Sequence, residues 1–247
     1  MKYERVLLKL SGRAVSGARE FGFSPESLEH IADEVLALHA RGVQISIVIG
    51  GGNIFHGHLA AQWGIERAEA DNIGMMGTII NSLMLRGVLK GRSNSSVEVR
   101  VMTAIPVNTV AEPFIRLRAV HHLEKGYIVI FAGGTGNPYV TTDYTAAQRA
   151  LETRCDGLLF AKNRARGIFT ADPREDPSAR MYRRVSYGTI LRNNLTVVDQ
   201  QSVILARDHH LPFHVFDFAE KSTIARLCCG DPETGTYVGD VEEDELA

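Results

Sequence analysis

The sequence predicts an α/β fold in which a mostly parallel sheet carries helices on both faces. Apolar runs rich in Val and Ile recur along the chain, and segments with apolar residues at helical spacing separate them. Runs that are apolar throughout are typical of parallel strands buried on both faces, and the alternation of strand and helix is typical of α/β proteins. No Pro- or Ser-rich linker divides the 247 residues. We therefore expect one domain over 1–247, with an acidic tail at 240–247 that frays.

Each expected strand is a short, mostly apolar run, and the first is followed by Gly12 and a segment that we expect to be a polar loop. Glycines follow two further runs directly, which favours tight turns at the strand ends. In chain order, the expected strands cover 5–10, 43–49, 97–105, 127–134, 156–163, 213–218 and 236–239.

The expected helices are marked by residues that favour helix ends. In the first helix, Ser24 is the expected N-cap, Pro25 lies in the first turn and Gly42 follows the last turn. A long Met- and Leu-rich helix is expected next, and its methionines are predicted to face the core or another subunit. The long helix is expected over 71–90. Four later helices are expected near 114–124, from Asp143, from Asp199 and within 221–230.

Charge and cysteine content exclude several classes of protein. The net charge is −2, which gives no electrostatic reason to expect a nucleic-acid or membrane partner. We find no apolar segment long enough for a signal peptide or a membrane span, so a cytoplasmic protein is expected. Cys155, Cys228 and Cys229 are odd in number and form no CxxC, which disfavours a disulfide framework or a zinc site.

Three glycine-containing loops are predicted to lie at one edge of the sheet. The segments "KLSG" (Lys9–Gly12), "IGGGN" (Ile49–Asn53) and "AGGTGNP" (Ala132–Pro138) each follow an expected strand. Because ligands of open α/β folds bind at the carboxyl edge, these loops are candidates for gripping phosphates with backbone N–H groups. Neither a P-loop nor a dinucleotide fingerprint is present, so positive charge must come from elsewhere, with Lys9 and Lys162 as candidates. Tight turns and solvated strand ends are the structural alternatives.

Several ordered motifs resemble those of the bacterial uridylate (UMP) kinases of the amino acid kinase superfamily. The motifs are "LLKLSG", "VIGGGNIFHG", "ADNIGMMGT", "AGGTGNPYVTTD", "AKN", "GIFTADP" and "ARDHHLP", and they run from the first strand to near the end of the chain. The resemblance implies a single three-layer αβα sandwich, a homohexamer, and transfer of phosphate from Mg²⁺-bound ATP to UMP, which gives UDP for pyrimidine nucleotide synthesis.

The resemblance also assigns roles to single residues. Lys9, Asp143 and Lys162 would be catalytic, and Asp71 would bind the ribose hydroxyls of UMP, although it could also be a helix N-cap. The implied UMP-binding residues are Gly51, Asp71, Thr135, Gly136, Asn137, Pro138, Tyr139, Val140, Thr141 and Thr142. The implied ATP-binding residues are Lys9, Leu10, Ser11, Gly12, Gly52, His56, Asn163, Phe169 and Asp172. No protein metal ligand is expected.

Three charged positions depart from the family pattern. Arg13 replaces the acid of "KLSGE", His56 replaces the usual arginine after "GGGN", and Arg166 replaces the aspartate of "VDG". Arginine is a permanent, bidentate phosphate partner and histidine is not. A second hypothesis is therefore a catalytically weak or inactive paralogue that binds nucleotide as a sensor or storage protein. A third is a carbamate or acetylglutamate kinase, which "GTGNPYVTTD" disfavours.

Overall fold

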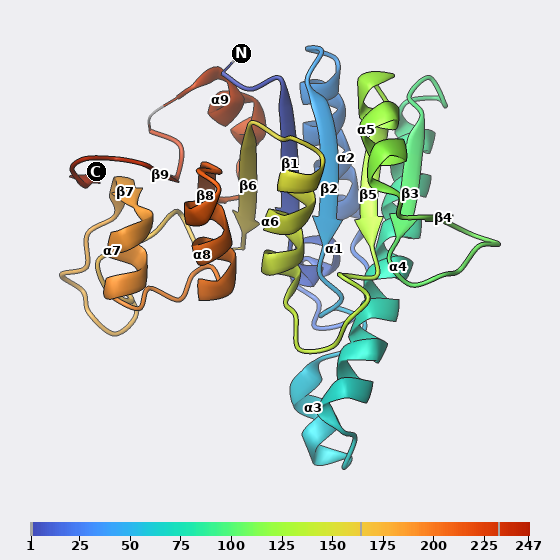
Figure 1. Cartoon of the computed structure of the whole chain (residues 1–247), viewed down its shortest axis with the longest axis horizontal. Helices are drawn as coiled ribbons and strands as arrows, with labels where there is room; N and C mark the ends of the chain where they lie inside the picture. Colours follow the sequence, from blue (N-terminus) through green and yellow to red (C-terminus); the bar gives the residue numbers. More distant parts are fainter. Residues whose placement is uncertain (1, 164, 232) are drawn as a thin grey trace.

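Helices lie on both faces of a ten-stranded sheet in the computed structural model, which describes residues 2–163, 165–231 and 233–247 (Figure 1). The sheet order is β10-β7-β9-β8-β6-β1-β2-β5-β3-β4. Neighbouring strands are parallel except at β8–β9 and β10–β7, which are antiparallel. The strands are β1 (Arg5–Leu10), β2 (Gln44–Ile49), β3 (Val99–Thr103), β4 (Glu112–Pro113), β5 (Ile128–Ala132), β6 (Gly157–Lys162), β7 (Tyr182–Ser186), β8 (Phe213–Asp217), β9 (Thr236–Gly239) and β10 (Glu245–Leu246).

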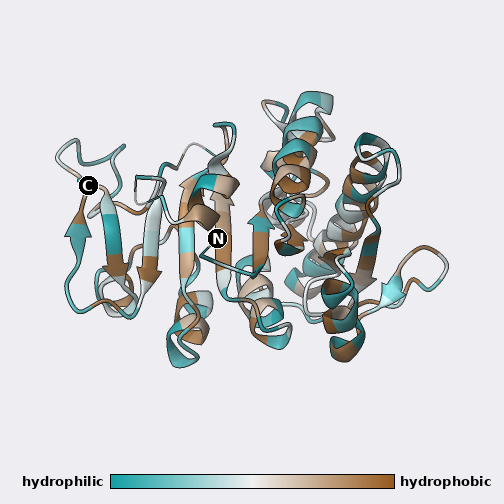
Figure 2. Cartoon of the chain, turned by 90° about the horizontal axis from the view of Figure 1, so that it is seen from above, coloured by the Kyte–Doolittle hydropathy of each residue, from teal (hydrophilic) through white to brown (hydrophobic). Residues whose placement is uncertain are grey.

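Successive side chains of the central strands pack into two apolar layers, one on each face of the sheet. The view from above shows the helices on both sides of the strands (Figure 2). On β1, Leu8 belongs to the apolar layer that includes residues of α2, α4 and α9, whereas Leu7 belongs to the layer that includes residues of α5, α6, α7 and α8. This confirms the predicted three-layer αβα fold. The helices are α1 (Gly12–Ser16), α2 (Pro25–His39), α3 (Gly57–Gln62), α4 (Arg67–Arg92), α5 (Arg116–Glu124), α6 (Thr142–Glu152), α7 (Tyr187–Arg192), α8 (Gln200–Asp208) and α9 (Thr223–Cys229).

Helix ends follow the local sequence closely in most places. Ser24 caps α2, with its hydroxyl accepting from the Ser27 N–H, and Gly42 has a φ of 85° after the helix end. The segment after Gly12 was expected to be a loop but forms α1, because the Ser11 hydroxyl accepts from the Ala14 N–H. The long helix α4 begins at Arg67, four residues before its expected start.

The acidic tail is ordered, and the expectation that 240–247 frays is wrong. Its residues 245–246 form β10, which pairs with β7, and the Ala247 N–H donates to the Met181 carbonyl. Asp244 accepts hydrogen bonds from the Ser186 N–H (2.8 Å) and the Thr189 hydroxyl (2.5 Å). The acidic residues thus find donors at the sheet margin, which composition alone does not reveal.

Strand β8 places a histidine inside the core. His214 is 5% exposed, and its Nε2 lies 2.9 Å from the Tyr3 hydroxyl. Burial, aided by the charge of Lys2, lowers the pKa of His214 to about 3. His214 is therefore neutral in the folded protein at pH 7.

Acid should destabilise the fold through His214. An unfolded histidine protonates near pH 6.5, so the contribution of His214 to stability is complete above that pH and declines as pH falls toward about 3. The expected loss is up to about 1.4 kcal/mol per pH unit. Urea denaturation from pH 7 to pH 4 of the natural protein and of His214→Gln measures it. The variant should show a shallower decline, and parallel curves would contradict the assignment.

Candidate active site

The three glycine-containing loops meet at the carboxyl edge of the parallel strands, beyond which α3 and part of α4 project (Figure 1). A Cβ at Gly12 would lie 2.6 Å from the Asn53 nitrogen and 2.7 Å from the Gly52 nitrogen, so the first two loops touch through their backbones. In the third loop, Gly133 has a φ of 72°. Only glycine satisfies this close approach and this backbone geometry without strain.

Helix α4 holds two of these loops with buried polar side chains. Asn81 donates from Nδ2 to the Gly50 carbonyl (2.7 Å), and the Thr78 hydroxyl accepts from the Gly133 N–H (2.8 Å). Neither residue was predicted to serve the site. Polar residues on an otherwise apolar helix face were the available signal, since buried polar groups require partners.

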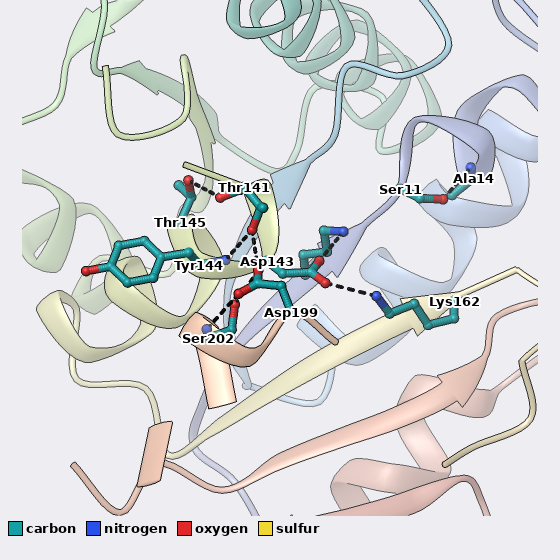
Figure 3. A network of polar contacts seen from close by, with 10 residues as sticks. Ser11, Ala14, Thr141, Asp143, Tyr144, Thr145, Lys162, Asp199 and Ser202 are labelled. Atoms are coloured by element: carbon teal, nitrogen blue, oxygen red, sulfur yellow. Dashed lines mark hydrogen bonds and ion pairs between the residues drawn. The ribbon is translucent and has the colours of Figure 1, made fainter. Parts of the chain in front are cut away.

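Lys9, Asp143 and Lys162 form one buried ionic cluster at this edge. Lys9 on β1 pairs with Oδ1 of Asp143, and Lys162 at the end of β6 lies 3.1 Å from Oδ2 (Figure 3). Lys9 is 6% exposed and Asp143 is 9% exposed. The structure therefore brings together the three residues predicted to be catalytic, and it does so from two neighbouring strands and the first turn of α6.

The charges in this cluster support one another. Burial by itself raises the pKa of Asp143, but the ammonium groups of Lys9 and Lys162 outweigh burial and hold it at about 2. Burial lowers the pKa of Lys162, and nearby Lys9 adds to that effect while Asp143 opposes it. With two cations on one anion, the cluster has an excess positive charge that suits a phosphate group.

Asp199, which was not predicted as a site residue, joins the start of α6 to the start of α8. The Thr141 hydroxyl caps α6 by accepting from the Tyr144 N–H (3.1 Å), and it donates to Asp199 (Figure 3). Asp199 also accepts from the backbone and hydroxyl of Ser202. Asp199 was predicted only as a helix start, and the structure shows it as the N-cap of α8.

Asp71 joins α4 to the loop that precedes α6. Its carboxylate accepts from the Tyr139 N–H (2.8 Å) and from Nε of Arg67 (2.9 Å). The alternative role as a helix N-cap is wrong, because Glu66 occupies that position. Tyr139 has a φ of 64°, so this contact fixes the loop at a strained residue.

Two cavities are lined in part by residues of the predicted site. One, of about 550 Å³, is lined in part by Thr135, Asn137 and Val140 of the loop. The other, of about 210 Å³, is lined in part by Lys162, Asn163 and Arg13. Three of the residues predicted to bind UMP thus line the first cavity, and one of those predicted to bind ATP, Asn163, lines the second.

The remaining predicted residues are distributed unevenly. Leu10 is fully buried, so only its backbone could meet a ligand, and Ser11 and Gly12 begin α1. His56 packs edge-to-face on Phe21 with ring centroids 5.4 Å apart, and lies near Gly52. Phe169, Asp172 and the exposed Arg166 belong to the segment between β6 and β7 and line neither cavity; Asp172 pairs with Arg174 instead.

Comparison with known proteins places the fold and these residues in a family. The model of the amino acid kinase family matches residues 4–217, a range that includes Lys9, Asp143 and Lys162. The chain belongs to the amino acid kinase family. It is 51% identical over 237 residues to a uridylate kinase of Frankia alni, covering 96% of this chain and 91% of that protein.

Solved amino acid kinase structures agree over nearly the whole chain. A UMP kinase of Bacillus anthracis is 55% identical with a TM-score of 0.96, and each chain is covered completely. A UMP kinase of Ureaplasma parvum is 30% identical with a TM-score of 0.90, covering 97% of this chain and all of that one. The strands after residue 217, β9 and β10, therefore belong to the same fold although the family model ends before them.

Proposed function

We propose that this chain is a uridylate kinase that transfers the γ-phosphate of ATP to UMP and releases UDP and ADP. The strongest support is the Lys9–Asp143–Lys162 cluster at the point where three glycine-containing loops meet. The uridylate kinases to which the chain is similar add to it. A non-catalytic sensor or storage protein is not favoured, because such a role requires no buried cationic pair at the junction of these loops.

The cluster suits phosphoryl transfer because that reaction depends on positioning and charge neutralisation. Lys9 and Lys162 would neutralise charge on the transferred group, and backbone N–H groups near Gly12 and Gly52 would hold its oxygens. Asp143 would orient both lysines and would not act as a base, because its pKa of about 2 makes it a poor proton acceptor. The phosphate oxygens of UMP are already ionised and need no base.

Mg²⁺ would enter with ATP as part of the substrate. In the described part of the chain, no group of three or more His, Cys, Asp or Glu side chains is placed to hold a metal ion. This fits Mg²⁺, which usually keeps several waters and binds through one or two carboxylates together with substrate phosphates. Asp143 and Asp199 are the carboxylates of the network that could contribute.

The test of this function is an assay of ADP release with ATP, Mg²⁺ and one nucleoside monophosphate at a time. UMP is expected to be the preferred acceptor over CMP, AMP and GMP, because Asp71 and the 135–142 loop would enclose its ribose and base. A higher turnover with a purine monophosphate than with UMP would overturn the assignment of UMP as the acceptor. The absence of turnover with every monophosphate would overturn the assignment of kinase activity.

Asp71→Ala is expected to weaken UMP binding. A carboxylate that accepts from ribose hydroxyls contributes about 1.5–3 kcal/mol, so the Kd for UMP should rise on the order of tenfold to a hundredfold. Calorimetry with UMP measures this, and Glu69→Ala, an exposed carboxylate on the same helix, is the control. An unchanged Kd would leave Asp71 as a clamp for the Tyr139 backbone only.

His56→Arg is expected to raise kcat. The side chain of residue 56 lies beside Gly52, in the loop that would hold the transferred group, and a guanidinium offers a permanent charge and a fork of donors. Steady-state kinetics with ATP and UMP varied separately measure the change. A fall in kcat would mean that the imidazole packed on Phe21 is itself the better fit.

We further propose that the kinase is a cytoplasmic homohexamer whose product feeds pyrimidine nucleotide synthesis. On α4, four apolar side chains are 40–45% exposed at helical spacing: Ile73, Met76, Ile80 and Met84. Such a stripe is typical of a subunit contact. Met75 differs, because it is buried in its own chain. Within the described residues, the helices are too short or too polar to cross a membrane.

A further inference from the structure

A third cavity lies at the opposite edge of the sheet from the ionic cluster. It has a volume of about 410 Å³ and is bordered by the segment before β1 and by β7, β8 and β9. His214 is the second residue of β8, whereas Lys162 of the cluster pairs in register with Asp217 at the other end of that strand. The residues that line this cavity are Lys2, Arg183, Arg184, His214, Gly230, Asp231, Thr234, Gly235 and Tyr237.

His214 lines this cavity and has one polar atom that is unpartnered among the described residues. Its Nε2 lies 2.9 Å from the Tyr3 hydroxyl, but its Nδ1 is buried and has no hydrogen-bond partner in the part of the chain that the structure describes. Buried polar atoms are nearly always paired, and leaving one unpaired is unfavourable. If the Tyr3 hydroxyl donates to Nε2, the Nδ1 atom carries the proton and is a donor that lacks an acceptor within the described chain.

Two cations of the cavity lining lie close to the same aromatic ring. Lys2 lies 4.4 Å and Arg184 lies 5.4 Å from the centre of the Tyr237 ring. Among the described residues, no carboxylate forms an ion pair with either side chain; the salt bridges at this place involve Arg183, which pairs with Glu233 (3.0 Å) and Glu245 (2.7 Å). Burial and then Arg184 lower the pKa of Lys2, which shows that the two charges oppose one another. An anion between them would relieve this repulsion.

The single carboxylate that lines the cavity is already engaged. Asp231 accepts from the Thr234 hydroxyl (2.8 Å) and from the Glu233 N–H (3.0 Å). Among the described residues it forms no ion pair with Lys2 or Arg184, and the three cationic side chains of the lining outnumber this one carboxylate.

We propose that this cavity binds a small phosphate-bearing anion, at a site separate from the proposed nucleotide site. The ammonium of Lys2, the guanidinium of Arg184 and the Nδ1–H of His214 are three donors from three segments of the chain, and together they match the several acceptor oxygens of a phosphate group. The cavity volume exceeds what one phosphate needs, so a diphosphate or a nucleotide can also enter.

The test follows the imidazole resonances of His214 while inorganic pyrophosphate is added. Long-range proton–nitrogen NMR spectra resolve the ring nitrogens, and His214→Gln identifies the signal among the nine histidines. Pyrophosphate should shift the His214 signal saturably. Lys2→Met and Arg184→Met should each weaken this binding about tenfold. A second arm with a nucleoside triphosphate shows whether a nucleoside adds affinity at this cavity; either order of affinity supports the site.

Two controls test whether the response belongs to this cavity and whether the cavity is independent of the proposed nucleotide site. Lys125→Met removes another exposed lysine and should leave the pyrophosphate titration of His214 unchanged. The double variant Lys2→Met, Arg184→Met should keep the natural rate of ADP release. The proposal is overturned if the His214 signal does not respond, or if it responds equally in the double variant.

Discussion

Lys9→Met is expected to lower kcat on the order of 10²-fold or more while the Kd for UMP changes far less. The Lys9 ammonium forms an ion pair with Asp143 at the junction of the three loops. It would therefore stabilise negative charge on the phosphoryl group during its transfer. Loss of one preorganised electrostatic stabiliser has an effect of this size. An interaction made mainly in the transition state appears in kcat and not in ground-state binding.

The measurement is steady-state ADP release together with calorimetry of UMP binding. Lys125→Met is the matched control, because Lys125 is an exposed lysine at the far end of α5. Turnover of the Lys9 variant within a small factor of the natural rate would make Lys9 a structural partner of Asp143. An equal loss of kcat and UMP affinity would instead indicate a distorted site, which thermal denaturation of the variant would reveal.

Local sequence patterns were sufficient for the central layers of the fold. The strands β1, β2, β3, β5, β6 and β8 are mostly apolar runs, and Ser24, Thr141 and Asp199 cap helices with their own side chains. Such signals lie within a few residues of the element that they define, so a sequence carries them without tertiary information.

The margin of the sheet was less predictable for a physical reason. Strand β7 contains Arg183 and Arg184, and only Tyr182 and Val185 among its residues are buried. Its polar side chains find partners in the acidic tail, as in the pair of Arg183 with Glu245. A long-range exchange of this kind leaves no local periodicity, which is why both β7 and the ordered tail were missed.

The residues of the candidate site likewise fall into those that local sequence patterns predict and those that only long-range contacts reveal. The glycines, Lys9 and Lys162 were predicted because strand ends and turns mark them locally. Asn81 and Asp199 were missed as site residues, since their contacts join segments that are 31 and 58 residues apart. The charge balance of the cluster also required the structure, because it depends on two lysines meeting one buried carboxylate.

Asp143→Asn is expected to reduce both stability and turnover. Asparagine keeps the shape of the side chain but leaves the ammonium groups of Lys9 and Lys162 without a counter-ion in a buried place. Removing one partner of a buried ion pair typically lowers the free energy of unfolding by about 3–5 kcal/mol. Turnover should fall as well, because the two lysines lose the group that orients them.

A surface ion pair supplies the matched control for this variant. Arg207 and Asp208 lie 2.7 Å apart, and both side chains are about half exposed. Asp208→Asn should therefore change the free energy of unfolding by less than about 1 kcal/mol. Urea denaturation at pH 7 compares the two variants, and equal small changes would mean that the buried cluster contributes no net stability.

The pH dependence gives the Asp143 prediction a second, independent readout. The folded pKa of Asp143 is about 2, below the value of 3.8 expected without its partners, so its stabilising contribution is complete above about pH 4 and is lost as pH falls toward 2. Between pH 7 and pH 5 the gap in unfolding free energy between the natural protein and Asp143→Asn should stay constant. Below pH 4 the gap should narrow, because the unfolded natural protein then takes up a proton on Asp143 while the folded protein does not, and the variant lacks this carboxyl. A gap that widens on acidification would contradict an anionic Asp143 held between two lysines.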